Sequence, residues 1–381
     1  MKIAVNSRGL QKDRLEGIGW FTYETLKRIT KSHPEHDFFF IFDRKFDESF
    51  IFSSNITPVI LPPRTRHLSL WWIWFEWSMP ILLKKIKPSI FLSLDGFIPL
   101  NNSIPSMAVI HDLSFVHRPD DLPFLFRNYC RTLFPRFARK ANRIATVSNF
   151  SKMDLIRTYK IDEAKIDVVG CGVNEVFKPI PQEEKQSARN QYALGNRFFL
   201  YTGALHARKN IENLLKAFDL LKERLTDAND NAGIKLLLIG KPMFISKSIF
   251  EVHKQLRHRD DVIFTGRLET DELAKLTASA EALLLVSFFE GFGIPILEAL
   301  NCDVPVIVSD RTSLPEVAGS AALYINPDSI ESISTAMFRV ISDYRLKQAL
   351  IEKGKEERKR FSWDITADNL WKNIEKITHE Q

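Results

Sequence analysis

The chain has 381 residues, of which 45% are hydrophobic and 26% are charged. This balance is ordinary for globular proteins and excludes extensive disorder. The length exceeds what one compact α/β core usually holds, so two domains are expected. The three cysteines are widely spaced and lie outside any CxxC pattern. They indicate neither a disulfide framework nor a zinc site, and they fit a reducing compartment.

The net charge of +6 would suit nucleic acid, anionic lipid or phosphorylated ligands. The basic residues are scattered and no nucleic-acid-binding motif is present, so no nucleic-acid partner is expected. The first residues, MKIAVNSRGL, lack the apolar region of a signal peptide. No uninterrupted run of eighteen apolar residues predicts a membrane span. We expect a cytoplasmic protein, with peripheral contact at the inner face of the membrane left open.

Short apolar runs alternate with amphipathic stretches along the whole chain. Continuous apolar runs are typical of strands buried on both faces of a parallel sheet, and their alternation with helices predicts doubly wound α/β domains. The runs expected to form strands are Ile3–Val5, Phe38–Phe42, Pro58–Leu61, Ile90–Leu94, Met107–Ile110, Ile144–Val147, Phe198–Tyr201, Lys235–Ile239, Val262–Phe264, Ala282–Val286, Val304–Val308 and Ala322–Ile325.

A polar segment with two prolines, around residues 174–194, suits a linker between two such domains. We therefore expect Rossmann-like domains over residues 1–178 and 179–361, with a ligand-binding cleft between them at the carboxyl ends of their strands. The segment 362–381, which contains the amphipathic stretch Trp363–Ile377, is expected to be a C-terminal helix.

The first candidate motif is Gly17-Ile-Gly19, which follows the first strand and opens a helix. A single GxG is weak evidence, and a plain helix start explains it equally well. The next unusual segment, residues 64–87, combines tryptophans with Lys84, Lys85 and Lys87. Such residue types occur in helices that bind membrane surfaces. A helix of the first-domain core, with some tryptophans lining an acceptor groove, is the favoured interpretation.

His111 and Asp112 follow at the carboxyl end of a predicted strand. A histidine at this position is either a buried structural residue or a contact to a ligand in the cleft, and its place at a strand terminus favours the ligand. In the second half, Gly203 precedes the adjacent cations Arg208 and Lys209, again between a strand and a helix. Cations are disfavoured at a helix start unless an anion binds there, so this pair indicates a diphosphate site.

The strongest signal is the segment from Ser287 to Glu298, which leads from a strand into a helix. Gly291 and Gly293 permit tight turns and a close approach of the backbone to a ligand. The helix start near Ile294 provides N–H donors suited to phosphate. Glu290 and Glu298, eight residues apart, could both accept hydrogen bonds from sugar hydroxyls. A capped helix with two solvated carboxylates is the alternative.

The Glu290-to-Glu298 segment resembles the E-x7-E signature of retaining glycosyltransferase family 4, of the GT-B fold. The glycine motif at Gly17, the His-Asp pair at His111 and the Arg-Lys pair at Arg208 are similar to that family as well. The resemblance implies that Glu290 and the backbone of Gly291, Phe292 and Gly293 bind the transferred sugar. It assigns the ribose to Glu298, with Leu297 beside it, and the pyrophosphate to Arg208, Lys209 and Ile294.

By the same resemblance, Gly17, Gly19 and Gly203 would border the donor, and His111 would contact the donor sugar near the reacting centre. One departure is Ala204, which stands where many family members carry an arginine. The segment Trp363–Ile377 looks like the helix that crosses back onto the first domain in GT-B proteins.

The resemblance implies transfer of a hexose from a nucleoside diphosphate sugar, the co-substrate, with retention and without a metal or other cofactor. GDP-mannose is the first choice of donor because the motifs resemble bacterial mannosyltransferases of surface-polysaccharide assembly. The acceptor would be a glycan or a lipid-linked glycan. A GT-B sugar phosphorylase, an epimerase, and a non-catalytic lipid- or nucleic-acid-binding protein remain alternatives. A dehydrogenase is disfavoured because no GxGxxG follows the first strand.

Overall fold

The computed structural model describes residues 1–12, 15–227, 233–243 and 247–379. These residues form two compact units. Unit 1 comprises Met1–Pro119, Pro123–Gly172 and Ser362–Gln381, and unit 2 comprises Asp120–Leu122 and Val173–Phe361. Among the described residues, no helix is both long and apolar enough to cross a membrane.

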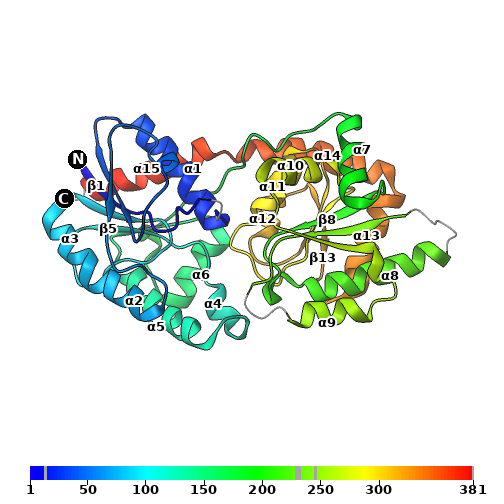
Figure 1. Ribbon diagram of the computed structural model, residues 1–381, viewed down its shortest axis with the longest axis horizontal. Coiled ribbons are helices and arrows are strands. Elements are labelled where there is room, and N and C mark those ends of the chain that lie inside the picture. The colour runs from blue at the N-terminus through cyan, green and yellow to red at the C-terminus, as the bar shows by residue number, and fades with distance from the viewer. Residues whose placement is uncertain (13–14, 228–232, 244–246, 380–381) are drawn as a thin grey trace. The chain divides into compact units, whose positions relative to one another are not determined.

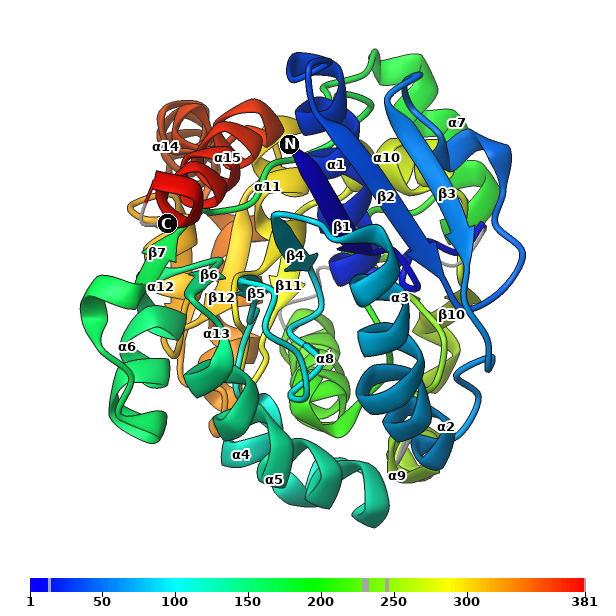
Figure 2. The same cartoon turned by 90° about the vertical axis from the view of Figure 1, so that its left-hand side faces the viewer.

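Unit 1 is built on a seven-stranded sheet in the order β3-β2-β1-β4-β5-β6-β7, and its first strands run side by side in Figure 2. Every pairing in it is parallel. The strands are β1 (Lys2–Asn6), β2 (Asp37–Phe42), β3 (Ile56–Ile60), β4 (Ile90–Ser93), β5 (Ser106–Val109), β6 (Arg143–Thr146) and β7 (Ile166–Val168).

Helices cover both faces of this sheet, α1 and α15 on one and α2, α3 and α5 on the other (Figure 1). Their bounds are α1 (Gly17–Ser32), α2 (Leu68–Ile73), α3 (Met79–Ile86), α4 (Ser114–His117), α5 (Phe124–Lys140), α6 (Asn149–Tyr159) and α15 (Trp363–His379). A π-helical turn, Trp74–Ser78, joins α2 to α3 without a break.

Helix α15 brings the end of the chain back to unit 1 and packs against α1. Arg28 Nε of α1 donates to Asp364 Oδ1 of α15 at 2.6 Å. The first residue of α15, Trp363, lies directly against Gly172. A Cβ added at Gly172 would lie only 2.2 Å from the backbone nitrogen of Trp363. A side chain at position 172 would therefore push the start of α15 away from the unit.

Unit 2 contains a six-stranded parallel sheet in the order β10-β9-β8-β11-β12-β13. Helices α8 and α13 pack together on one face, and α10 and α11 lie on the other (Figure 1). The elements are α7 (Gln182–Ala193), β8 (Phe198–Thr202), α8 (Ile211–Asp227), β9 (Lys235–Ile239), α9 (Lys247–Gln255), β10 (Val262–Gly266), α10 (Thr270–Ser279), β11 (Leu283–Leu285), α11 (Ile294–Asn301), β12 (Val306–Ser309), α12 (Leu314–Ala318), β13 (Ala322–Ile325), α13 (Ile330–Ser342) and α14 (Tyr344–Glu357).

The predicted α/β class with two parallel sheets is confirmed, and each predicted strand overlaps an observed one. Strand β7, at the edge of the first sheet, was not predicted. Its Asp167 pairs with Arg143 at 2.5 Å and with Lys376 at 2.9 Å, so a charge interrupts the apolar run by which buried strands are identified.

The composition-based linker, residues 174–194, is only partly correct, because α7 occupies residues 182–193 and packs against α10 of unit 2. Pro181 precedes the helix, and Glu183 and Glu184 fall in its first turn, where acidic side chains favour a helix. Polarity alone does not distinguish such an exposed helix from a linker.

Candidate functional site

The loop between β11 and α11 carries the first predicted carboxylate. Gly293 caps α11 with a φ of +103°, and a Cβ there would lie 2.8 Å from Leu314 Cδ2. This backbone conformation is open to glycine and strained for other residues. It turns the chain into α11, whose first N–H group, that of Ile294, has no acceptor within the helix. The sequence therefore builds a helix start able to donate to an anion.

Glu290 lies in this loop, is only 6% exposed, and pairs with both predicted cations. Its Oε2 lies 2.9 Å from Arg208 Nη1, and its Oε1 lies 2.5 Å from Lys209 Nζ. Burial alone would raise the pKa of this carboxyl, but the charges of Lys209 and Arg208 outweigh burial and lower the pKa to about 2. Glu290 is therefore ionised at neutral pH and contacts two cations.

The loop itself is held by hydroxyl groups that the sequence analysis did not single out. Ser287 Oγ donates to Glu290 Oε1 at 2.6 Å, and Glu290 N–H donates to Thr312 Oγ1 at 3.2 Å. Ser313 Oγ lies within hydrogen-bond distance of the carbonyls of Glu290 (2.9 Å) and Phe292 (3.1 Å). The place of Ser287 at the start of the motif was a signal that could have identified it.

Arg208 and Lys209 lie in a 3₁₀ turn, Ala207–Lys209, before α8 begins. This agrees with the expected place of the pair between a strand and a helix. His206 Nδ1 caps the turn by accepting from Arg208 N–H at 3.1 Å. Asn210 ends it with a φ of +60°. The turn is tied to the Glu290 loop because Phe288 N–H donates to the Arg208 carbonyl at 2.9 Å.

Gly203 stands at the end of β8 with a φ of +138°. Its carbonyl would lie 1.8 Å from a Cβ added at Gly240, so two loops meet closely here. Tyr201 Oη donates to the carbonyl of Ala204 at 2.8 Å and fixes the next residue. Packing against Gly240 and the hydrogen bond from Tyr201 thus fix the loop after β8, and with it the position of Arg208.

Glu298 differs from Glu290 in its surroundings. It lies in α11, partly exposed, between the buried residues Leu297 and Ala299. Burial raises the pKa of its carboxyl to about 7. Neither glutamate is thus a fully solvated carboxylate, which excludes the alternative of a capped helix with two solvated acids. Phe292 points into the core and packs edge-on against Phe361 at 5.6 Å, leaving its backbone as the group that could contact a ligand.

The other predicted residues belong to unit 1. Gly17 and Gly19 form the first turn of α1, which begins at Gly17 itself. N–H groups in a first helical turn have no acceptor within the helix and can donate to an anion. A Cβ at Gly17 would meet nothing within 4 Å, whereas one at Gly19 would lie 3.1 Å from Leu15 Cδ2. Tight packing therefore explains Gly19, but it does not explain Gly17.

His111 follows β5 and is held by its surroundings. Its Nε2 lies 2.9 Å from the carbonyl of Leu94, and its ring packs edge-on against Phe21 at 4.9 Å. Burial lowers the pKa of His111 despite the raising effect of that hydrogen bond, so the ring is neutral at pH 7. Because a carbonyl only accepts, Nε2 carries the proton and Nδ1 is the acceptor. These features are those of a structural histidine, and its contact with a ligand stays a prediction.

The groups brought together in unit 2 could hold a dianionic phosphate ester beside a polyol. Arg208, Lys209 and the start of α11 supply positive charge. Glu290 and Glu298 supply acceptors for hydroxyl groups. The three cysteines, by contrast, are buried free thiols, and burial raises the pKa of Cys130 to about 12. A thiolate nucleophile is not expected at that position.

Comparison with known proteins identifies both halves of the chain. Residues 15–177 match the family model Glycosyltransferase Family 4, and residues 182–357 match the model Glycosyl transferases group 1. O-antigen chain mannosyltransferase B of Escherichia coli is 28% identical over 260 residues, 68% of this chain and 67% of that protein. O-antigen chain mannosyltransferase RfbU of Salmonella typhimurium is 29% identical over 269 residues, 70% and 69% of the two chains.

The solved structure of sucrose-phosphate synthase from Thermosynechococcus elongatus superposes with a TM-score of 0.78 at 17% sequence identity, covering 100% of both chains. Similarity at this level of identity concerns the fold. Together with the two parallel sheets and the return of α15 to unit 1, it confirms the expected GT-B architecture.

Proposed function

The chain belongs to glycosyltransferase family 4, and from this premise we propose that it transfers a mannosyl residue from GDP-mannose to a glycan or lipid-linked glycan acceptor. The anomeric configuration of mannose is retained in the product. Two O-antigen mannosyltransferases that match about two thirds of the chain support the choice of sugar and of polysaccharide assembly as the pathway. GDP-mannose as the donor, retention of configuration and the predicted site residues are all parts of this proposal.

The buried cluster of Glu290, Arg208 and Lys209 is the observation that carries the proposal. Two cations contact one buried carboxylate, Arg208 at 2.9 Å and Lys209 at 2.5 Å, so both cations are held where a diphosphate could contact them together. A diphosphate that enters here takes Arg208 and Lys209 as partners, and Glu290 then turns its acceptors to the hydroxyls of the sugar. Charge that develops on the departing diphosphate is stabilised by the same cations and by the start of α11.

Glu298 and the loop amides complete the donor site in this proposal. Glu298, one turn into α11, accepts hydrogen bonds from the ribose hydroxyls. The N–H groups of Gly291, Phe292 and Gly293 donate to the sugar, and Leu297 lies beside the nucleoside. Gly203 borders the diphosphate. From unit 1, Gly17 and Gly19 approach the phosphates through their backbone, and His111 contacts the sugar through Nδ1.

A screen by thermal shift tests the donor. GDP-mannose should raise the melting temperature more than UDP-glucose or ADP-glucose at equal concentration, because a ligand stabilises the folded state in proportion to its binding. Incubation of GDP-mannose with an O-antigen-type acceptor, followed by NMR of the product, then tests transfer and retention. Inverted product would overturn the retaining mechanism, and phosphate-dependent cleavage of a glycan without nucleotide would favour a phosphorylase.

A further inference from the structure

We propose that the outer surface of α2 and α3, together with the start of α5, binds the surface of an anionic phospholipid bilayer. This surface, called the tryptophan face below, is defined by Trp72, Ile73, Trp77, Ile81, Lys84 and Lys85. The inference deepens the proposed function by naming the surface that would bring the enzyme to a lipid-linked acceptor. Bilayer binding is nevertheless measured without donor or acceptor, so it can fail or succeed independently.

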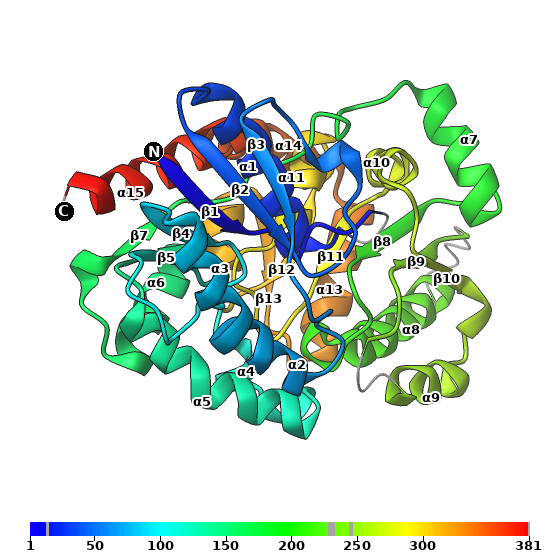
Figure 3. The ribbon, with the colours of Figure 1, turned by 60° about the vertical axis from the view of Figure 1, so that its left-hand side comes forward.

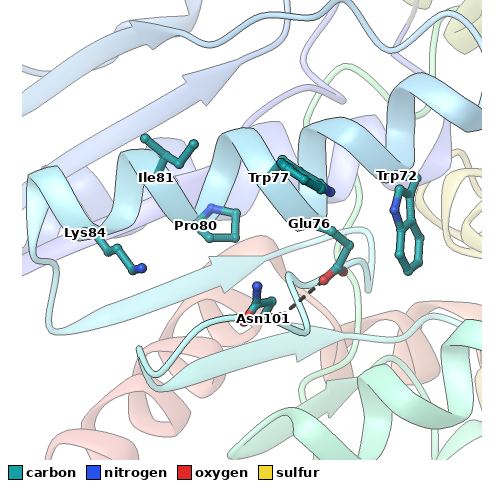
Figure 4. Close-up of a pocket in the computed structure, with 7 residues that line it drawn as sticks. All are labelled: Trp72, Glu76, Trp77, Pro80, Ile81, Lys84 and Asn101. Carbon is teal, nitrogen blue, oxygen red and sulfur yellow. Dashed lines mark hydrogen bonds between the residues drawn. The ribbon is translucent and has the colours of Figure 1, made fainter.

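Large apolar side chains lie exposed along one side of this helical stretch. Trp77 and Ile81 are 66% and 68% exposed, and Trp72 and Ile73 are 42% and 43% exposed. Their spacing of about four residues places them on one side of a helix. Figure 4 shows Trp72, Trp77 and Ile81 along the helix. Contiguous exposed apolar groups of this size commonly mark an interaction site.

The opposite side of the same helical stretch packs into the core of unit 1. Trp74, Phe75, Met79 and Leu83 are fully buried. Trp74 Nε1 donates to the carbonyl of Leu61 at 2.8 Å, which anchors the helix to the end of β3. Packing in unit 1 therefore accounts for the inner residues. It gives no reason for tryptophan at positions 72 and 77.

A shallow hollow of about 360 Å³ lies on the tryptophan face, lined by Trp72, Glu76, Trp77, Pro80, Ile81, Lys84 and Asn101. Glu76 is the one acidic residue of this lining. Its carboxylate accepts hydrogen bonds from the backbone N–H groups of Leu100 at 3.0 Å and Asn101 at 3.2 Å, and Figure 4 shows the bond to Asn101. The single acid of residues 68–87 thus holds a neighbouring loop. The negative charge of Glu76 is therefore stabilised by these backbone N–H groups.

Basic side chains follow the apolar ones. Lys84, Lys85 and Lys87 are exposed at the end of α3. Lysines at this place can extend toward lipid phosphates while the tryptophans lie among the headgroups. Charge complementarity therefore selects an anionic surface as the partner.

Helix α5 extends the surface and repeats its chemistry. It lies next to α2, because Trp71 packs edge-on against Phe126 at 6.0 Å and Tyr129 at 6.1 Å, and the two helices are neighbours in Figure 3. At its start, Phe124 and Leu125 are 65% and 71% exposed. Residues 124–140 contain five basic and no acidic side chains. Two adjacent helices thus present apolar and basic groups without exposed acids of their own.

A second copy of the chain is a less suitable partner for this surface. In a symmetric pairing each residue of the tryptophan face meets a residue of the same face in the other copy, and the residues that define the face offer no carboxylate to Lys84 and Lys85. Such a contact would bury these lysines without an opposite charge from the face, whereas lipid phosphates neutralise them. The bilayer therefore accounts for both the apolar and the basic members of the face.

Vesicle sedimentation tests the proposal with the full chain. The wild type should bind vesicles of phosphatidylglycerol and phosphatidylcholine, and binding should weaken in pure phosphatidylcholine and at high salt. Trp77→Ser with Ile81→Ser should lower the partition coefficient at least about tenfold. Lys84→Gln with Lys85→Gln should reduce the preference for anionic vesicles, because Lys87 and the basic side chains of α5 remain. Tyr344→Ser with Lys359→Gln is the matched control, since these exposed residues of unit 2 should leave binding unchanged.

The variants must first melt at the wild-type temperature, so that a folding defect is recognised without the use of donor or acceptor. Vesicle binding of wild-type strength in the Trp77/Ile81 variant would overturn the proposal. Equal binding to anionic and neutral vesicles would overturn its charged part. A Trp77-dependent dimer in light scattering, without vesicle binding, would assign the surface to self-association instead.

Discussion

Lys209 Nζ lies 2.5 Å from Glu290 Oε1, so the cation proposed to hold the diphosphate is paired with the carboxylate proposed to hold the sugar. Arg208 makes the same kind of contact to the other carboxylate oxygen. These ion pairs therefore link the two proposed subsites. In the proposed function, donor binding exchanges one set of ion pairs for another. A change at one subsite should consequently be measurable at the other.

The first prediction concerns free nucleoside diphosphate. Glu290→Gln should bind GDP more tightly than the wild type, by about tenfold, because removing a charge about 4 Å from a phosphate removes a repulsion of roughly 1–4 kcal/mol. The same variant should lose mannosyl transfer by at least about a hundredfold, since the amide cannot replace the buried carboxylate. Isothermal titration with GDP and a transfer assay measure the two effects.

Glu281 provides a matched control for this substitution. It too is a buried glutamate of unit 2 with two cationic partners, Arg189 at 3.3 Å and Lys347 at 2.6 Å. Glu281→Gln should cost stability in the same way and leave GDP affinity unchanged. If both variants changed GDP affinity equally, the effect would come from stability and not from the proposed site.

The second prediction concerns the leaving group. Lys209→Ala should lower kcat by about a hundred- to a thousandfold, the usual cost of removing one charge-stabilising group from a transition state. The pKa of Glu290 should also rise, because Lys209 is the largest of the influences that lower it. Steady-state kinetics over a range of GDP-mannose concentrations separates kcat from KM.

Lys347→Ala is the control for this variant, because Lys347 pairs with Glu281 at 2.6 Å in the same unit. Its kcat should match the wild type once both proteins are shown to be folded. A full-rate Lys209→Ala enzyme would remove this lysine from the transition-state contacts.

The third prediction is a pH dependence of donor binding. Burial raises the pKa of Glu298 to about 7. The ionised carboxylate can accept from the two ribose hydroxyls with its two oxygens, whereas protonation turns one of these oxygens into a donor. GDP affinity should therefore fall as the pH is lowered through 7, and Glu298→Gln should bind more weakly with a flat profile. The 2′,3′-dideoxy analogue of GDP should show little of this dependence in the wild type. An unchanged slope with the analogue would assign the titration to another group.

The raised pKa of Glu298 also makes folding stability depend on pH. A carboxyl whose pKa is higher in the folded than in the unfolded chain binds more protons when folded, so its contribution to stability falls as pH rises from about 4.5 to 7. Glu298→Gln should therefore gain stability relative to the wild type at pH 8 and less so at pH 5. Urea unfolding at both pH values measures the difference.

The positions of the strands along the chain could be predicted because they depend on local apolar runs such as Lys235–Ile239, which β9 reproduces. Contacts between distant residues could not be predicted in this way. The motifs located Arg208 and Glu290, but their pairing spans 82 positions and depends on β8 and β11 being neighbours in the sheet. The sequence therefore identified the residues of the cluster but not the ion pairs between them.

The tryptophan-rich segment shows a second limit. A core helix was the favoured interpretation, and it is correct for Trp74, whereas Trp72 and Trp77 are exposed. The π-helical turn Trp74–Ser78 adds a residue to one turn and shifts the phase of the helix. Periodicity at 3.6 residues per turn therefore could not assign each tryptophan to the inner or the outer side.

The fourth prediction separates a structural glycine from a ligand-facing one. Gly293→Ala should destabilise the protein by about 2 kcal/mol, because its φ of +103° is strained for alanine and its new Cβ would lie 2.8 Å from Leu314. Gly17→Ala should not, since a Cβ there meets nothing within 4 Å and alanine favours a helix. Thermal unfolding of the two variants gives this comparison.

Transfer kinetics then test the proposed place of Gly17. If the backbone of the first turn of α1 approaches the donor phosphates, a methyl group at position 17 should crowd the ligand. The KM for GDP-mannose should then rise about tenfold at an unchanged melting temperature. An unchanged KM would show that the open space beside Gly17 is ordinary solvent. A role of Gly17 at the donor would then be ruled out, and the phosphate contacts would have to come from unit 2.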